Sequence, residues 1–121
     1  MDEETRKYWK EEEEEEQFHV HEFLGSTRLA ELEEEPHNHR FAGVSCEAIC
    51  CGEHQHIHEI KARTDFFEDH FHEICVRSCP AICVGDGKHV HFVSGTTTEV
   101  DDHVHTFVFA TLIENPIGDR D

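Results

Sequence analysis

Histidine is the residue type with the most evident chemistry in this chain. Thirteen histidines stand among 121 residues, and twelve of them form His-x-His pairs. The pairs are His19/His21, His37/His39, His56/His58, His70/His72, His89/His91 and His103/His105. Neutral imidazole is a common nitrogen ligand of transition metals, so paired histidines are candidate metal ligands. His54 stands outside the pairs and is not expected to be a primary ligand.

Each His-x-His pair belongs to a longer repeat. An apolar side chain follows two residues after every second histidine: Phe23, Phe41, Ile60, Ile74, Val93 and Phe107. A hydroxyl stands eight residues after every first histidine: Thr27, Ser45, Thr64, Ser78, Thr97 and Thr111. Glycine occurs between these positions at Gly25, Gly43 and Gly95. Successive pairs start 18, 19, 14, 19 and 14 residues apart, which indicates three copies of a double unit.

The spacing of the repeat favours strands over helices. Residues i, i+2 and i+4 share one face of a strand, so both histidines and the apolar residue point the same way in every copy. We therefore predict an all-β fold of six short strands, in three pseudo-repeats of a two-strand unit. These would form a closed β-prism or barrel, or a solenoid-like body, with a central axis lined by histidine. The His-x-His repeat domain is assigned to residues 19–121.

Buried histidines need partners. An unpaired buried polar group costs about 1–3 kcal/mol, so twelve would exceed the roughly 5–15 kcal/mol that stabilises a typical domain. Three pairs around an axis supply six nitrogens, an octahedral set. One predicted site takes the pairs that begin at His37, His70 and His103, and the other takes those that begin at His19, His56 and His89. Stacking of histidine rings between strands is the main alternative.

Octahedral nitrogen coordination narrows the choice of cofactor. It suits Fe(II), Ni(II) or Co(II) better than Zn(II), which prefers four ligands, and iron is favoured on availability. A site whose six positions are all filled has no room for water or substrate, so it is structural or electron-transferring rather than hydrolytic. We expect no catalytic role, since the repeated hydroxyls are six equivalents suited to turns or caps and no phosphate-binding glycine loop is present.

The charge of the chain limits its partners. Lysine and arginine number 10 against 28 aspartates and glutamates, a formal net charge of -18. Such a chain repels nucleic acid and anionic membrane surfaces, so neither is an expected partner. Residues 1–18 form an acidic N-terminal tail or arm, in which Tyr8 and Trp9 are candidate anchors for a neighbouring subunit. The start lacks the pattern of a secretory signal, so we expect a cytoplasmic protein, with a spore or cell-surface assembly as the alternative.

Six cysteines form a second candidate set: Cys46, Cys50, Cys51, Cys75, Cys79 and Cys83. Most recur every four residues, with the opposite strand parity to the histidines, so these thiols are expected to face outward. Disulfides within or between chains, inert thiols and a second metal site all stay open for them. No Cys-x-x-Cys-His is present, which excludes covalent c-type haem.

The chain resembles the YmaF-like family of small bacterial proteins over about residues 19–113. The resemblance rests on Asp-His-Phe-His at 69–72, Pro-Ala-Ile at 80–82, Gly-Lys-His-Val-His-Phe at 87–92, Gly-Thr-Thr at 95–97 and Asp-His-Val-His at 102–105. It implies no known activity, and the cysteines depart from the family pattern. In motif and strand use alone, the repeat is also similar to the iron-bearing tips of phage long tail fibres, where three chains contribute His-x-His to each ion.

These observations lead to a functional hypothesis. We expect a metal-stabilised structural protein with hexahistidine sites, which assembles with itself into a homo-oligomer or filament through outward cysteines, edge strands and the N-terminal arm. A metal storage, buffer or sensor protein is one alternative. An iron-based electron relay is another.

Overall fold

Each double repeat of the sequence forms an antiparallel hairpin in the computed structural model, which describes residues 19–116. The first hairpin pairs β1 (Glu22–Ser26) with β2 (Arg40–Val44), and the last pairs β8 (Phe92–Thr96) with β9 (Thr106–Ala110). The middle one pairs the second half of β4 (Gln55–Arg63) with β5 (Glu73–Arg77). The prediction of an all-β fold is confirmed, because the described residues form strands and no helix.

Residues 19–116 form nine strands rather than the six expected. The additional pairing lies between successive hairpins, where β3 (Ala48–Gly52) pairs with the first half of β4, and β6 (Ile82–Gly85) pairs with β7 (Lys88–Val90). Their turns carry residues with positive φ, including Gly52 and Gly87, so the chain can reverse tightly there. These connections are therefore ordered hairpins, which the prediction of six strands did not include.

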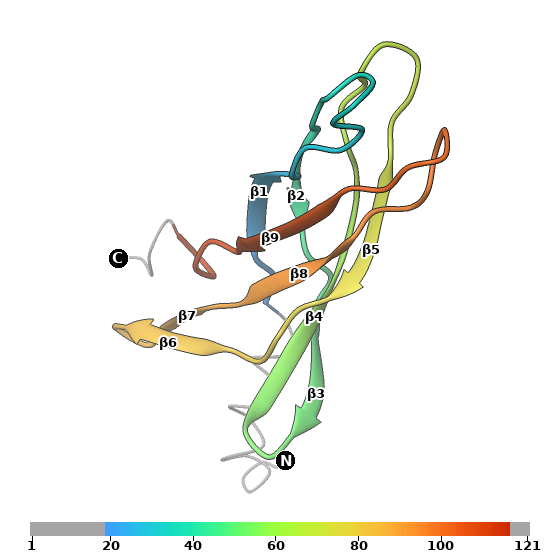
Figure 1. Cartoon of the computed structure of the whole chain (residues 1–121). Coiled ribbons are helices and arrows are strands. Elements are labelled where there is room, and N and C mark those ends of the chain that lie inside the picture. The colour runs from blue at the N-terminus through green and yellow to red at the C-terminus, as the bar shows by residue number, and fades with distance from the viewer. Residues whose placement is uncertain (1–18, 117–121) are drawn as a thin grey trace, which may run out of the picture.

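Backbone hydrogen bonds connect the three main hairpins to one another. Each hairpin donates to, and accepts from, both of the others: Asp65 N to Arg40 O, Thr98 N to Glu73 O, Arg28 N to Thr106 O, Cys46 N to Glu59 O, Cys79 N to Phe92 O and Leu112 N to Glu22 O, all at 2.8–3.0 Å. The strands nevertheless stay in four separate sheets, and strand pairing within residues 19–116 closes no barrel. Figure 1 shows the loops after β1, β4 and β8 at the upper end, away from the β3–β4 and β6–β7 hairpins.

The core lies where the inner faces of the three hairpins meet. Its buried hydrophobic members are the six apolar residues of the repeat: Phe23, Phe41, Ile60, Ile74, Val93 and Phe107. Each packs beside a cross-strand neighbour of complementary size. Phe23 and Phe41 face Gly43 and Gly25, whereas the smaller Val93 faces Phe109. A Cβ on Gly43 would stand 2.9 Å from Phe23 Cζ, so these glycines are required by the large rings opposite them.

The structure does not test the prediction for the N-terminal arm. The acidic arm at residues 1–18, with Tyr8 and Trp9, lies outside the described residues. Within the described part, the chain has no helix long and apolar enough to cross a bilayer.

Candidate metal centres

The twelve paired histidines gather into two clusters. Centre 1 contains His19, His21, His56, His58, His89 and His91, and centre 2 contains His37, His39, His70, His72, His103 and His105. Within each centre the potential ligand atoms lie within 4.8 Å of one another. The memberships are the two sets that the repeat predicted, and one chain supplies each set completely. His54 lies in the β3–β4 turn and belongs to neither centre.

Hairpin geometry explains why there are two centres. In each main hairpin, one His-x-His pair lies just before the paired part of the first strand and another just before the second. Because the two strands run antiparallel, these pairs lie at opposite ends of the hairpin. Three hairpins therefore contribute three pairs to each end, with the apolar core between the centres. The second histidine of every pair is deeply buried, from 0% exposed for His21 and His58 to 1% for His105.

Hydrogen bonds set the tautomer of the second histidine in each pair. A backbone carbonyl can only accept, so the ring nitrogen next to it must carry the proton and donate. The Nδ1 donors and their carbonyl acceptors are His21 to Leu112, His39 to Asp65, His58 to Cys46, His72 to Thr98, His91 to Cys79 and His105 to Arg28, at 2.8–2.9 Å. The Nε2 atom of each ring is left with a free lone pair, which is the form that binds a metal.

The repeated hydroxyl supports this arrangement. Ser45 Oγ accepts a hydrogen bond from the His21 backbone N–H and donates one to Cys46 O, the carbonyl that holds His58. It also lies 3.3 Å from His58 Nδ1. The contacts with the backbone N–H and with Nδ1 recur at the other five hydroxyls. The donation to the next carbonyl recurs at Thr64, Ser78 and Thr97. The hydroxyl therefore links the histidine of its own hairpin to a histidine of the next, a role beyond the turn or cap that the sequence suggested.

The spacing of the Nε2 atoms fits octahedral coordination. His19 and His21 lie 3.1 and 3.0 Å from His89 at centre 1, and His72 lies 3.2 Å from His103 at centre 2, all between Nε2 atoms. A metal–nitrogen bond of about 2.1 Å gives an octahedron with edges of about 3.0 Å and diagonals of about 4.2 Å. The rings meet edge to face, as in the 90° angle between His37 and His103, which disfavours the alternative of stacked histidines.

Within the described part of the chain, four buried ring nitrogens have no hydrogen-bond partner: the Nε2 atoms of His37, His58, His91 and His105. Two of these belong to each centre. An unsatisfied buried acceptor is costly, and lone pairs that point toward one another repel. A cation between them removes both penalties, so the donor set fits a transition-metal ion.

Burial and crowding keep these rings neutral. Burial, together with the neighbouring histidines, lowers the pKa of His19 and His89 from 6.5 to about 3. Burial likewise lowers the pKa of His58 to about 3, although its hydrogen bond to Cys46 raises it, and the pKa of His105 to about 4. Desolvation is the largest cause in each case, because the low-dielectric interior disfavours an imidazolium. The neutral, ligating form therefore persists at neutral pH.

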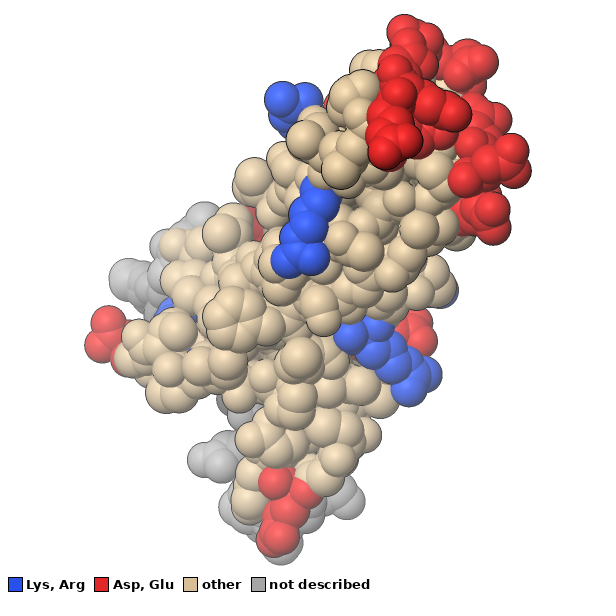
Figure 2. All heavy atoms as spheres, in the orientation of Figure 1, with Lys and Arg blue, Asp and Glu red and all other residues tan. Residues whose placement is uncertain are grey.

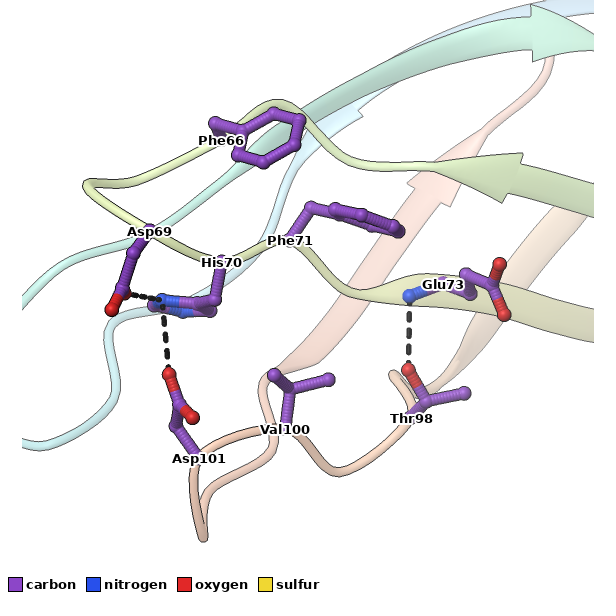
Figure 3. A pocket seen from close by; sticks show the side chains of 8 residues that line it. All are labelled: Phe66, Asp69, His70, Phe71, Glu73, Thr98, Val100 and Asp101. Atoms are coloured by element: carbon purple, nitrogen blue, oxygen red, sulfur yellow. Dashed lines mark hydrogen bonds and ion pairs between the residues drawn. The ribbon is translucent and has the colours of Figure 1, made fainter.

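Carboxylates lie beside the Nδ1 atoms of His70, His89 and His103, and no role was predicted for them from the sequence. Glu114 Oε2 is 3.3 Å from His89 Nδ1 at centre 1, and Glu31 Oε2 is 3.3 Å from His103 Nδ1 at centre 2. Figure 3 shows Asp69 and Asp101 beside His70, each 3.7 Å from its Nδ1. Carboxylates in this position commonly orient a metal-binding histidine.

The six cysteines face outward and form no disulfide within the described part of the chain. All six are exposed, as their strand parity indicated, and all six are free thiols. Disulfides within the chain, one of the alternatives left open for these residues, are therefore not formed in this structure. Disulfides between chains stay a prediction.

The fold and its two centres define a class: an all-β protein with a small apolar core between two buried histidine clusters that could hold metal ions. The chain belongs to the YmaF family, described as "Spore germination protein GerY/YamF", whose model matches residues 16–113. This confirms the resemblance seen in the repeat. No curated protein and no solved structure matches the chain.

Proposed function

We propose that this protein is a non-catalytic structural protein in which each chain holds two transition-metal ions, one in each hexahistidine centre. The observation that carries the proposal is the set of buried, unpaired Nε2 atoms described above. The backbone carbonyls already occupy the Nδ1 side of the inner rings, so the free lone pairs are directed into the centres. With six imidazoles on one ion, no position remains for a substrate.

The ions would act as clamps on a closed, three-sided prism. Support for the prism comes from the cycle of backbone hydrogen bonds that joins each main hairpin to both others. Among residues 19–116 only six apolar side chains are buried, which is a small core. A small core commonly needs a metal or a covalent staple. Each ion would tie three hairpins together at one end and supply the missing stability.

The donor set also favours particular metals. Six neutral nitrogens suit Fe(II), Ni(II) and Co(II), and iron is our first choice on availability. Zinc would use four of the six rings and leave two without a partner. The iron, nickel and cobalt forms are distinguishable by elemental analysis of protein purified without chelators.

Stoichiometry tests this function directly. We expect two metal ions per chain in a monomeric preparation. His58→Ala and His105→Ala should each remove one ion, because they lie in different centres. His54→Ala is the matched control, since His54 belongs to neither centre, and it should retain both ions. Metal content well below one ion per chain, or equal loss in the His54 variant, would contradict the proposal.

A metal buffer or sensor is the second candidate function. It is favoured by the side chain of His89, which is 13% exposed and so offers a route to centre 1. The two functions differ in how they release metal. A structural ion should resist chelators until the fold melts, whereas a buffer should lose its ions while the strands stay intact. Complete metal loss with unchanged circular dichroism would favour the buffer.

We also propose that the protein works in the spore and assembles with itself into a homo-oligomer or filament. The family description refers to spore germination, which supports the location. The exposed cysteines support the assembly, because outward thiols can form disulfides between chains in an oxidising environment. A ladder of oligomers on non-reducing gels, abolished by reductant, is the expected sign.

A further inference from the structure

We infer that Glu31 and Asp101 are positioning residues that set the metal affinity of centre 2. This inference rests on the proposed function and assigns a role to carboxylates that bind no metal themselves. Each acts through the histidine it faces: Glu31 through His103, and Asp101 through His70.

The contacts run between hairpins. Glu31 belongs to the β1–β2 loop and reaches a histidine that precedes β9, whereas Asp101 belongs to the β8–β9 loop and reaches a histidine that precedes β5 (Figure 3). His70 and His103 are well shielded, with side chains 8% and 7% exposed. Glu31 is 23% exposed, so its charge acts on His103 more strongly than it would in bulk water, whereas Asp101 is 59% exposed and its charge is partly screened by solvent.

The chemistry of imidazole explains why these carboxylates are not a separate cation site. A neutral imidazole has one nitrogen lone pair, and the Nε2 atoms of His70 and His103 lie 3.2–3.3 Å from Nε2 atoms of other centre 2 rings. When Nε2 binds an ion, the proton of the neutral ring sits on Nδ1, the side that Asp69 and Asp101 face at His70. A proton-bearing Nδ1 repels a second cation but attracts a carboxylate. The attraction makes the ring a stronger donor to the ion in the centre.

The backbone supports a specific role for these acids. Glu31 and Asp101 have φ values of 57° and 53°, in the left-handed region. Val100 and His103 pair across a two-residue turn in which Asp102 also has positive φ, 66°. Aspartate, like asparagine and glycine, is common at such positions, whereas glutamate is uncommon there. The glutamate at the strained position 31 therefore indicates that its carboxylate, and not the turn, is required.

The surroundings of these acids predict opposite effects on the metal-free and metal-bound protein. Figure 2 shows a dense acidic patch at the loop end of the molecule, and a hollow there is lined by Glu31, Glu33, Glu34, Asp101 and Asp102. Without a cation these like charges repel one another. When centre 2 holds a cation, the carboxylates that face its histidines stabilise the bound state. Neutralising Glu31 and Asp101 should therefore raise the melting temperature of the metal-free protein and weaken metal binding.

The decisive variant is Glu31→Gln/Asp101→Asn, which keeps the size and acceptor oxygens of both side chains but removes their charges. Competition titrations with Ni(II) and a chromophoric chelator should show one of the two binding constants weakened by about 10–100-fold, the usual effect of losing such partners. Glu33→Gln/Glu34→Gln is the matched control, because it removes two charges from the same hollow without touching a histidine contact. Its binding constants should stay within about twofold of the original, since Glu33 and Glu34 are exposed and their charges are largely screened by salt.

Glu114→Gln shows which binding constant belongs to which centre in the same experiment. Because Glu114 faces His89 of centre 1, this variant should weaken the other constant. Substitution with Co(II) adds a spectroscopic readout, in which the visible absorption of only the affected centre should shift. Equal weakening in the control variant, or unchanged constants in the Glu31/Asp101 variant, would overturn this inference while leaving two bound ions intact. A native protein that binds no Ni(II) would instead overturn the proposed function, and this inference with it.

Discussion

At the scale of single residues, the chemistry is decided by which ring nitrogen carries the proton. Each inner histidine donates from Nδ1 to a backbone carbonyl, so its Nε2 lone pair is available before any ion arrives. A backbone carbonyl can only accept a hydrogen bond, whereas a hydroxyl partner could donate or accept one. Ligand orientation is therefore built into the backbone, and little reorganisation is needed on binding.

The pH dependence of stability follows from the depressed histidine pKa values. In the folded chain the pKa of His58 and His89 is about 3, and that of His56 about 4, against an ordinary value of 6.5. Between these limits the unfolded chain binds more protons than the folded chain, so the free energy of unfolding decreases as the pH falls. One buried histidine such as His58 contributes a slope approaching about 1.4 kcal/mol per pH unit. Metal release by protonation has the same sign.

We therefore expect a melting temperature that is constant from pH 8 to pH 7 and falls steadily below about pH 6, where unfolded histidine begins to titrate. Differential scanning calorimetry of the protein as isolated measures this. His54→Ala serves as the control and should follow the same curve, because His54 belongs to neither centre. A melting temperature unchanged between pH 8 and pH 4 would contradict the burial of neutral rings.

At the scale of strands, the hairpins pack by matching large residues with small ones across each pair. Phe23 and Phe41 lie opposite glycines, Ile74 lies opposite Ala62, and Val93 lies opposite Phe109. The six positions of the repeat thus differ in size while the volume of each cross-strand pair is roughly kept. Such matching lets three different hairpins fill one core without voids.

Gly43→Ala tests this matching. The new Cβ would stand 2.9 Å from Phe23 Cζ, so the ring must shift within the core. Overpacking of this kind costs about 1–3 kcal/mol, which in a domain of about 100 residues lowers the melting temperature by at least 4 °C. Ala42→Val is the control: it adds more volume at the exposed neighbouring position on β2. A larger loss of stability in the control would show that the clash is not the cause.

At the scale of the whole molecule, both centres are made within one chain. Each joins residues that are far apart in the sequence, such as His21 and His91 at centre 1. Closing such long loops costs conformational entropy, which ligation of an ion in each centre would offset. At a free metal concentration one hundred times Kd, each ion would add about 2.7 kcal/mol.

Removing the metal should therefore lower the melting temperature, and restoring two ions per chain should recover it. Because the ligands of each centre come from one chain, the melting temperature of the metal-loaded protein should not depend on protein concentration. Thermal melts over a hundredfold range of concentration measure this, with reductant present to exclude disulfides. A melting temperature that rises with concentration would show that the fold depends on contacts between chains other than disulfides.

Much of this protein was readable from the order of its residues. A period of two places His58 and Ile60 on one face of a strand whatever surrounds them, so the inward histidines, the six apolar residues and the outward thiols were all predicted correctly. Grouping the pairs into two sets followed from alternating unit lengths. These are local or periodic properties, and local geometry determines them.

The tertiary structure alone decided what each histidine touches on its far side. The carbonyl of Leu112 holds His21, and the carboxylate of Glu31 faces His103, across separations that no periodic pattern encodes. The additional β3–β4 and β6–β7 pairings and the separation of the cysteines were decided in the same way. The physical reason is that strand periodicity fixes which way a side chain points, whereas the packing of one hairpin against another fixes what it meets.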